Sequence, residues 1–68
     1  MPSESAGEKA RRKIMALAIG EFVDFKENQT AAYNAAVKVE KEHRRFFTKR
    51  FNNGPTPITN FIRITRFS

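Results

Sequence analysis

The segment at residues 61–67 constrains the fold more than any other, because its side chains alternate in character. Ile62 and Ile64 fall on one side of an extended strand. The opposite side carries aromatic, basic and hydroxyl groups, namely Phe61, Arg63, Thr65 and Phe67. This alternation is typical of an antiparallel sheet with one buried face and one uncovered face. We therefore expect a sheet that is covered on one side.

Two further strands are predicted, at residues 21–25 and 46–51. One face of the second of these carries Phe47, Lys49 and Phe51. Its other face carries Phe46, Thr48 and Arg50. Phe47 is expected to pack on the isoleucines of the last strand, together with Phe22 or Val23. A loop over residues 52–60, rich in Asn, Gly and Pro, joins the last two strands.

The spacing of small apolar residues predicts an amphipathic helix over residues 29–44. Positions i, i+3, i+4, i+7 and i+11 are Ala32, Ala35, Ala36, Val39 and His43. Asn28 is a residue type that caps helix N-termini. Because the stripe consists mostly of alanine, the helix is able to lie close to the sheet. Glu40 and Glu42 are interpreted as parts of its solvent-exposed surface.

Residues 1–12 are polar and basic and are expected to form a flexible N-terminal tail, with one domain over residues 13–68. Ser5 and Glu8 nevertheless have the spacing of a capping box, and a short helix or turn ending at Gly20 is favoured over an extended segment at residues 14–19. The predicted fold class is α+β. A three-stranded antiparallel sheet in the order β-α-β-β is covered on one face by one helix.

The length of 68 residues limits the chain to one small core, without a deep substrate cleft. No cysteine is present, and the one histidine, His43, cannot form a zinc site alone. Neither a phosphate-binding loop nor a dinucleotide-binding glycine motif occurs. We expect no enzymatic activity, no metal and no cofactor.

The charge is distributed unevenly along the chain. Residues 1–43 carry seven basic and seven acidic side chains, whereas residues 44–68 carry six basic side chains and no acid. The whole net charge of +6, and five of the seven phenylalanines, therefore lie in the last part of the chain. A field of one sign attracts polyanions. Basic and aromatic groups interleaved on an uncovered sheet suit nucleic acid, through stacked bases or through a groove.

The sequence therefore predicts a nucleic-acid-binding protein, with DNA favoured over RNA. The expected binding residues are Arg44, Arg45, Phe46, Lys49, Arg50, Phe61, Arg63 and Arg66. Arg50 and Arg63 are expected to be central, the other cations to contact phosphates, and the phenylalanines to stack. Alternatives are an inhibitor that binds an acidic surface of a host protein, an internal virion protein that neutralises packaged DNA, and a homodimer that buries the phenylalanines.

The chain also resembles a group of short, mostly uncharacterised bacteriophage proteins. The matching pattern begins with Leu17, Ile19, Gly20, Glu21 and Val23 and continues through an alanine-rich helix. It ends with a Phe-Thr-x-Arg strand at residues 47–50 and an Ile-Arg-Ile-x-Arg strand at residues 62–66. The resemblance implies a phage origin and the β-α-β-β order, and it makes Arg50, Arg63 and Arg66 the motif arginines. Thr65 departs from the pattern, which commonly has an aromatic residue there.

The apolar run at residues 14–19 is only six residues long and is followed by Gly20 and Glu21. It is too short for a membrane span and lacks a cleavage pattern for secretion. We therefore expect a cytoplasmic protein that does not bind membranes, in the host cytoplasm if a phage encodes it.

Overall fold

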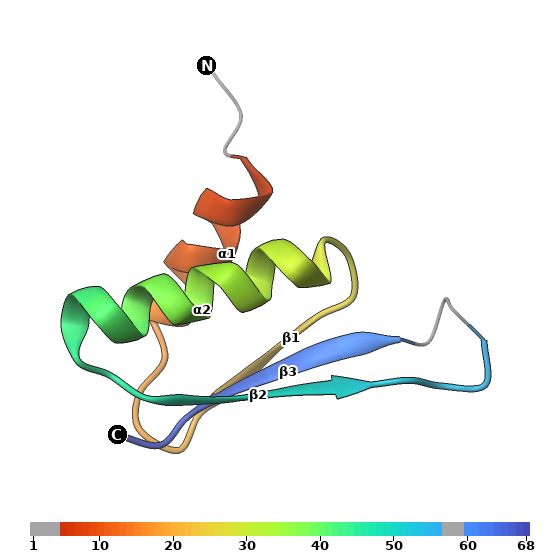
Figure 1. Cartoon of the computed structure of the whole chain (residues 1–68). Coiled ribbons are helices and arrows are strands. Elements are labelled where there is room, and N and C mark those ends of the chain that lie inside the picture. The colour runs from red at the N-terminus through yellow and green to blue at the C-terminus, as the bar shows by residue number, and fades with distance from the viewer. Residues whose placement is uncertain (1–4, 57–59) are drawn as a thin grey trace.

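The computed structural model describes residues 5–56 and 60–68. These residues form α1 (Ala6–Met15), β1 (Phe22–Phe25), α2 (Gln29–His43), β2 (Phe47–Asn52) and β3 (Phe61–Arg66). The three strands form one antiparallel sheet in the order β1-β3-β2. Both helices lie on the same side of this sheet (Figure 1). The predicted α+β class and the antiparallel sheet are confirmed.

The prediction of a single helix is wrong, because a second helix occupies much of the predicted tail. Ser5 begins α1 as its N-cap, and its side chain accepts a hydrogen bond from the Glu8 backbone N–H at 3.2 Å. Ala10 and Ile14 then face inward and are buried. Residues 6–12 therefore belong to the folded part of the chain, whereas residues 1–4 lie outside the described residues.

The second helix agrees with the predicted range to within one residue. Four residues of the predicted stripe are buried, namely Ala32, Ala35, Ala36 and Val39. His43, the last position of that stripe and the last residue of the helix, is exposed. Asn28 is the N-cap residue, but its side chain makes no capping hydrogen bond. Arg44 ends the helix in the left-handed conformation, with φ of 52°.

The sheet register fixes which side chains share a face. Ile62 lies opposite Phe25 and Phe51, and Ile64 lies opposite Val23 and Lys49. Both isoleucines are fully buried beneath the helices, as the alternation of residues 61–67 predicts. The central position of β3 explains this burial, because neighbouring strands flank it on both sides.

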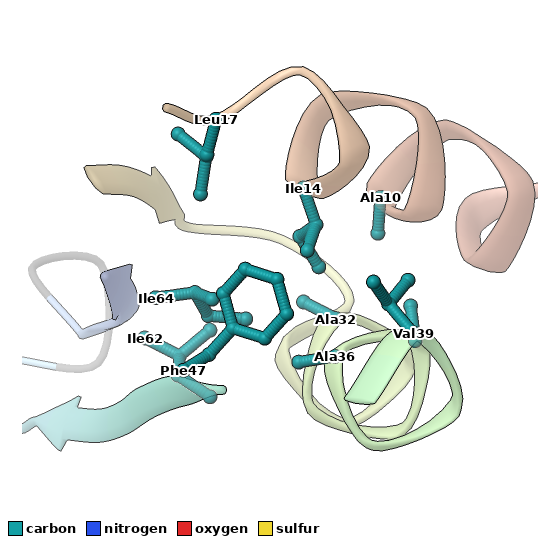
Figure 2. Close-up of a cluster of buried hydrophobic side chains, with 10 residues drawn as sticks. Ala10, Ile14, Leu17, Ala32, Ala36, Val39, Phe47, Ile62 and Ile64 are labelled. Atoms are coloured by element: carbon teal, nitrogen blue, oxygen red, sulfur yellow. The ribbon is translucent and has the colours of Figure 1, made fainter. Parts of the chain in front are cut away.

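The core lies between the sheet and both helices. Figure 2 shows Phe47 and the two isoleucines of β3 beside side chains of α1 and α2. Ile14 of α1 and Val39 of α2 are as completely buried as the isoleucines of the sheet. Val23 and Phe25 of β1 pack at the margin of this core, so Val23 and not Phe22 joins it.

The connection between β2 and β3 corresponds to the predicted loop over residues 52–60. Its start is held by a hydrogen bond from the Gly54 backbone N–H to the Asn60 side chain at 2.9 Å. Positions 57–59 of the predicted loop lie outside the described residues.

Candidate nucleic-acid interface

The side of the sheet opposite the helices is not covered by any described part of the chain (Figure 1). We call this side the open face. From one end of the strands to the other it carries Phe46, Phe67, Thr48, Thr65, Phe22, Arg50, Arg63, Asp24 and Phe61. More than half of the surface of Phe22, Phe46 and Phe67 is exposed. Solvent-exposed phenylalanines next to arginines are therefore the main feature of this surface.

Arg63 lies at the centre of the open face and is paired with an acid. Its guanidinium donates from Nε to Oδ1 of Asp24 at 2.8 Å and from Nη2 to Oδ2 at 3.0 Å. The two residues lie directly opposite each other on β3 and β1. The hydrogen bonds and charge of Arg63 lower the pKa of Asp24 below its ordinary range, and Asp24 in turn raises the pKa of Arg63. The positive charge of Arg63 is thus largely balanced.

Aromatic rings flank the same guanidinium. Its central carbon lies 4.2 Å from the ring centre of Phe22 and 5.6 Å from that of Phe61. Both distances fall within the range of cation–π attraction. Asp24 and these two rings restrict Arg63 from three directions, so the centre of the open face is ordered without a ligand.

Arg50 differs from Arg63 although the two are direct neighbours across β2 and β3. Arg50 is exposed, and its guanidinium has no partner within residues 5–56 and 60–68. Asn52 donates a hydrogen bond to the backbone carbonyl of Arg50, which leaves the side chain unaffected. Arg50 is therefore a cation that an anionic partner can reach without displacing an internal contact.

Phe46 and Phe67 form the end of the open face near the C-terminus. Their ring centres are 6.2 Å apart, with the planes tilted by 32°. The backbone N–H of Phe67 donates to the carbonyl of Phe46, which extends the pairing of the strands by one step. Phe46 is thus on the predicted face, together with Phe67.

Lys49, Arg45 and Arg66 are predicted binding residues that the fold uses for internal contacts. Lys49 points toward the helices, where its Nζ lies 2.8 Å from Oε1 of Glu40. Its side chain is only 18% exposed. Lys49 therefore does not belong to the open face.

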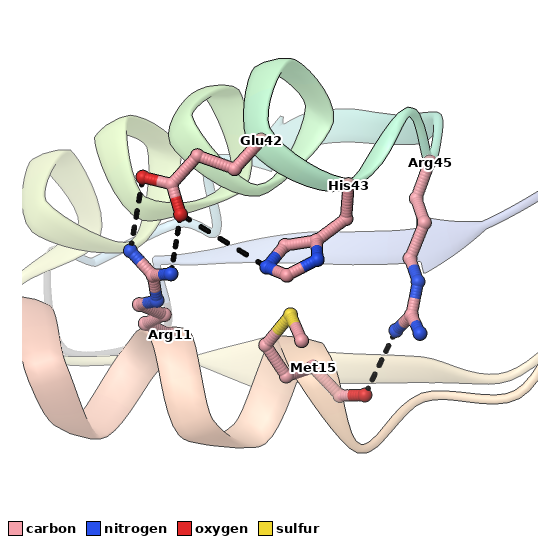
Figure 3. A network of polar contacts seen from close by, with 5 residues as sticks. All are labelled: Arg11, Met15, Glu42, His43 and Arg45. Atoms are coloured by element: carbon pink, nitrogen blue, oxygen red, sulfur yellow. Dashed lines mark hydrogen bonds and ion pairs between the residues drawn. The ribbon is translucent and has the colours of Figure 1, made fainter.

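Arg45 and Arg66 both donate to main-chain carbonyls at the end of α1 or just after it. Arg45 donates to the carbonyl of Met15 at 3.1 Å (Figure 3). Arg66 donates to Leu17 and to Ser68, both at 3.1 Å. The remaining predicted cation, Arg44, is exposed at the C-terminal end of α2.

Glu40 is not the solvent-exposed residue that the sequence predicts, because its side chain is only 19% exposed, whereas Glu42 is exposed as predicted but is engaged by another helix. Oε2 of Glu40 accepts the backbone N–H of Phe47, while Oε1 accepts Lys49. Glu42 pairs with Arg11 of α1 through both carboxylate oxygens, and His43 lies 3.9 Å from it (Figure 3). The contacts of Arg11 lower the pKa of Glu42. These acids hold α2 to β2 and to α1.

Sequence reasoning missed Phe22 and Asp24 as members of the open face. The four residues of β1 allow either Phe22 or Phe25 to point inward, since both faces contain a phenylalanine. The presence of Asp24 in β1 indicates which of its two faces is uncovered. A carboxylate is costly to bury without a partner, so its face must be the uncovered one, and Phe22 shares that face.

No family model, curated protein or solved structure matches the chain. The phage resemblance therefore stays a prediction. Within residues 5–56 and 60–68, no group of three or more His, Cys, Asp or Glu side chains is arranged to hold a metal ion. Over the same residues, neither helix has the length and apolar character that crossing a membrane requires.

Proposed function

We propose that the protein binds nucleic acid through the open face. The observation that carries this proposal is Arg50, an exposed cation whose side chain has no partner among the described residues, beside a sheet surface that exposes several phenylalanine rings. Cations that contact phosphates and rings that stack on bases are the two elements of sequence-tolerant nucleic-acid binding. Arg50 provides the first element, and the phenylalanines provide the second.

The charge available for binding is smaller than the net charge of +6 implies. Of the six cations in residues 44–68, Lys49, Arg45 and Arg66 make internal contacts, and Arg63 is balanced by Asp24. Among the described residues, this leaves Arg50 on the open face and Arg44 at the C-terminal end of α2 for phosphates. Each phosphate contact contributes about −0.7 to −0.9 to the log–log salt slope. With two contacts, we expect a shallow slope of roughly −1.4 to −1.8.

The test is a fluorescence-anisotropy titration of labelled DNA and RNA oligonucleotides at several salt concentrations. Arg50→Gln should weaken binding and reduce the magnitude of the slope by about 0.7 to 0.9. Lys41→Gln is the matched control, because Lys41 is an exposed cation on α2, in the layer away from the open face. An equal effect of both variants would mean that only the overall charge matters, and the open face would then not be the site.

A second candidate function is contact with an acidic surface of another protein. The specific observation is the pair of Phe46 and Phe67, both more than half exposed and in contact with each other. Adjacent exposed aromatic residues are enriched at protein interfaces. If no oligonucleotide binds even at low salt, this candidate replaces the first. Loss of partner capture in a Phe46→Ser, Phe67→Ser double variant would then support it.

A further inference from the structure

We infer that the open face binds a single strand and not a duplex, with the sugar–phosphate backbone along β2 and the bases across β3 and β1. This inference rests on the proposed function and adds the class of polymer and its placement. It follows from the spacing of the aromatic rings and from the opposite charges on the two outer strands.

The register arranges the open face in rows that cross the sheet. Phe22 shares a row with Thr65 and Thr48, and Arg63 shares the next row with Asp24 and Arg50. The following row contains Phe61 and Asn52. Phe22 and Phe61 therefore lie in different rows, on either side of the row of Arg63.

Adjacent rows are separated by two residues of strand, or about 7 Å, so the Cα atoms of Phe22 and Phe61 lie in rows about 13 Å apart. Their rings lean toward Arg63, whose central carbon is 4.2 Å from the ring centre of Phe22 and 5.6 Å from that of Phe61. The guanidinium therefore lies close to both rings, and their centres are less than about 10 Å apart. Bases stacked in a duplex follow each other every 3.4 Å or so along each strand. Two bases that stack on these rings must therefore be separated from each other. A single strand can spread its bases in this way, whereas a duplex would first have to open.

The charges on the two outer strands determine where the backbone lies. Arg50 of β2 attracts a phosphate, whereas the carboxylate of Asp24, on β1 in the same row, repels one. Arg63 lies between them and is engaged by Asp24. A single-stranded nucleic acid with its phosphates over β2 and its bases extending toward Phe61 and Phe22 keeps the phosphates near Arg50. The same placement keeps them away from Asp24.

A duplex meets two obstacles on the same surface. The major groove admits a two-stranded ribbon, and its walls are phosphates on both sides. The open face is three strands wide, so the third strand would bring Asp24 toward one of these phosphate walls. In addition, phenylalanine rings offer no hydrogen bond to the base edges that a groove exposes.

The test compares a labelled single-stranded oligonucleotide with the duplex of the same sequence, using the full chain at low salt. We expect the single strand to bind at least about tenfold more tightly. Phe22→Leu and Phe61→Leu should each weaken single-strand binding by roughly fivefold or more, without changing the salt slope. Phe61→Tyr keeps a ring and should restore binding.

Phe51→Leu is the matched control for the ring variants. Phe51 is about as exposed as Phe22, but it lies on the helix side of β2, where it stacks on Tyr33 with ring centres 6.0 Å apart. Its loss should leave single-strand binding unchanged. Circular dichroism of every variant shows whether the fold is retained.

A second measurement does not depend on removing a ring. The chain contains no tryptophan, so Phe22→Trp introduces a single tryptophan into the open face. Its emission should be quenched when the single strand stacks on it, and quenching should be weaker with the duplex. Equal affinity for duplex and single strand, or no effect of the ring variants, would overturn this inference and leave the proposed function intact. Absence of binding to both polymers would overturn the proposed function itself.

Discussion

Asp24 and Arg63 lie directly opposite each other on adjacent strands and share two hydrogen bonds, of 2.8 and 3.0 Å, on the open face of the sheet. This pairing changes the electrostatics of the surface, since the most central arginine is balanced before any ligand arrives. The pair also orders Arg63 against the ring of Phe22. Its removal has consequences for binding and for stability.

Asp24→Asn should strengthen nucleic-acid binding at low salt by roughly two- to fivefold, equivalent to less than about 1 kcal/mol. The substitution removes a charge that repels phosphate and releases the charge of Arg63. Anisotropy titrations measure the change, and Glu27→Gln serves as the control, because it removes an exposed acid outside the strands. Weaker binding by Asp24→Asn would show that Arg63 must be held in place to act.

The same pair should make stability depend on pH in the acid range. Hydrogen bonds from Arg63 lower the pKa of Asp24 below its ordinary value of 3.8. As pH falls through this range, the unfolded chain takes up the proton first, and the folded state loses its advantage. The free energy of unfolding of the wild type should therefore fall more steeply than that of Asp24→Asn below about pH 5. Urea titrations at several pH values measure this, and parallel curves would contradict it.

The burial of Ile14 makes α1 a part of the core. Ile14→Val should lower the free energy of unfolding by about 0.5–1.5 kcal/mol, because it removes a fully buried methylene. Ile19→Val makes the same chemical change at a residue that is 65% exposed, and it should change stability by less than about 0.5 kcal/mol. Urea denaturation compares the two, and equal effects would place α1 outside the cooperative fold.

Ser5 should contribute to stability through its cap of α1. Ser5→Ala should lower the free energy of unfolding by about 1 kcal/mol, because the Glu8 backbone N–H loses its acceptor. Ser5→Asp should restore stability, since a carboxylate also accepts this hydrogen bond and interacts favourably with the helix dipole. Thermal denaturation of the three proteins checks the order, and an unchanged Ser5→Ala variant would show that the cap does not form in solution.

Lys49→Gln should affect stability and not binding, in contrast to Arg50→Gln. The ion pair of Lys49 with Glu40 is shielded, and its loss should lower the free energy of unfolding by about 1.5 kcal/mol. The salt slope of nucleic-acid binding should stay unchanged, because Lys49 points toward the helices. A reduced slope in this variant would mean that Lys49 leaves Glu40 to contact phosphate.

Local sequence patterns were sufficient to predict most of the sheet. Alternation placed Ile62 and Ile64 in the core and Arg50 and Arg63 on the other face, because that pattern depends only on the two-residue period of a strand. The stripe of α2 was equally clear. These features do not require knowledge of distant contacts.

The capping-box spacing of Ser5 and Glu8 indicated where α1 begins, but the length of α1 and the partners of the charged residues could not be derived in the same way. A ten-residue helix is marginal alone, and α1 is stabilised by packing on α2 and by the contact of Arg11 with Glu42, 31 positions away. Likewise, nothing near Lys49 in the sequence shows that Glu40 faces it across the turn from α2 to β2. Which cations are available for binding and which make internal contacts could therefore be decided only from the tertiary contacts.

Arg45 and Arg66 show that net charge and structural role are independent properties of this chain. Lysine at both positions would leave the net charge unchanged. It would nevertheless lose the planar group with which Arg66 reaches two carbonyls at once, on Leu17 and Ser68. Two homologous sequences of equal charge could therefore differ in how firmly the segment after their first helix is held to the sheet.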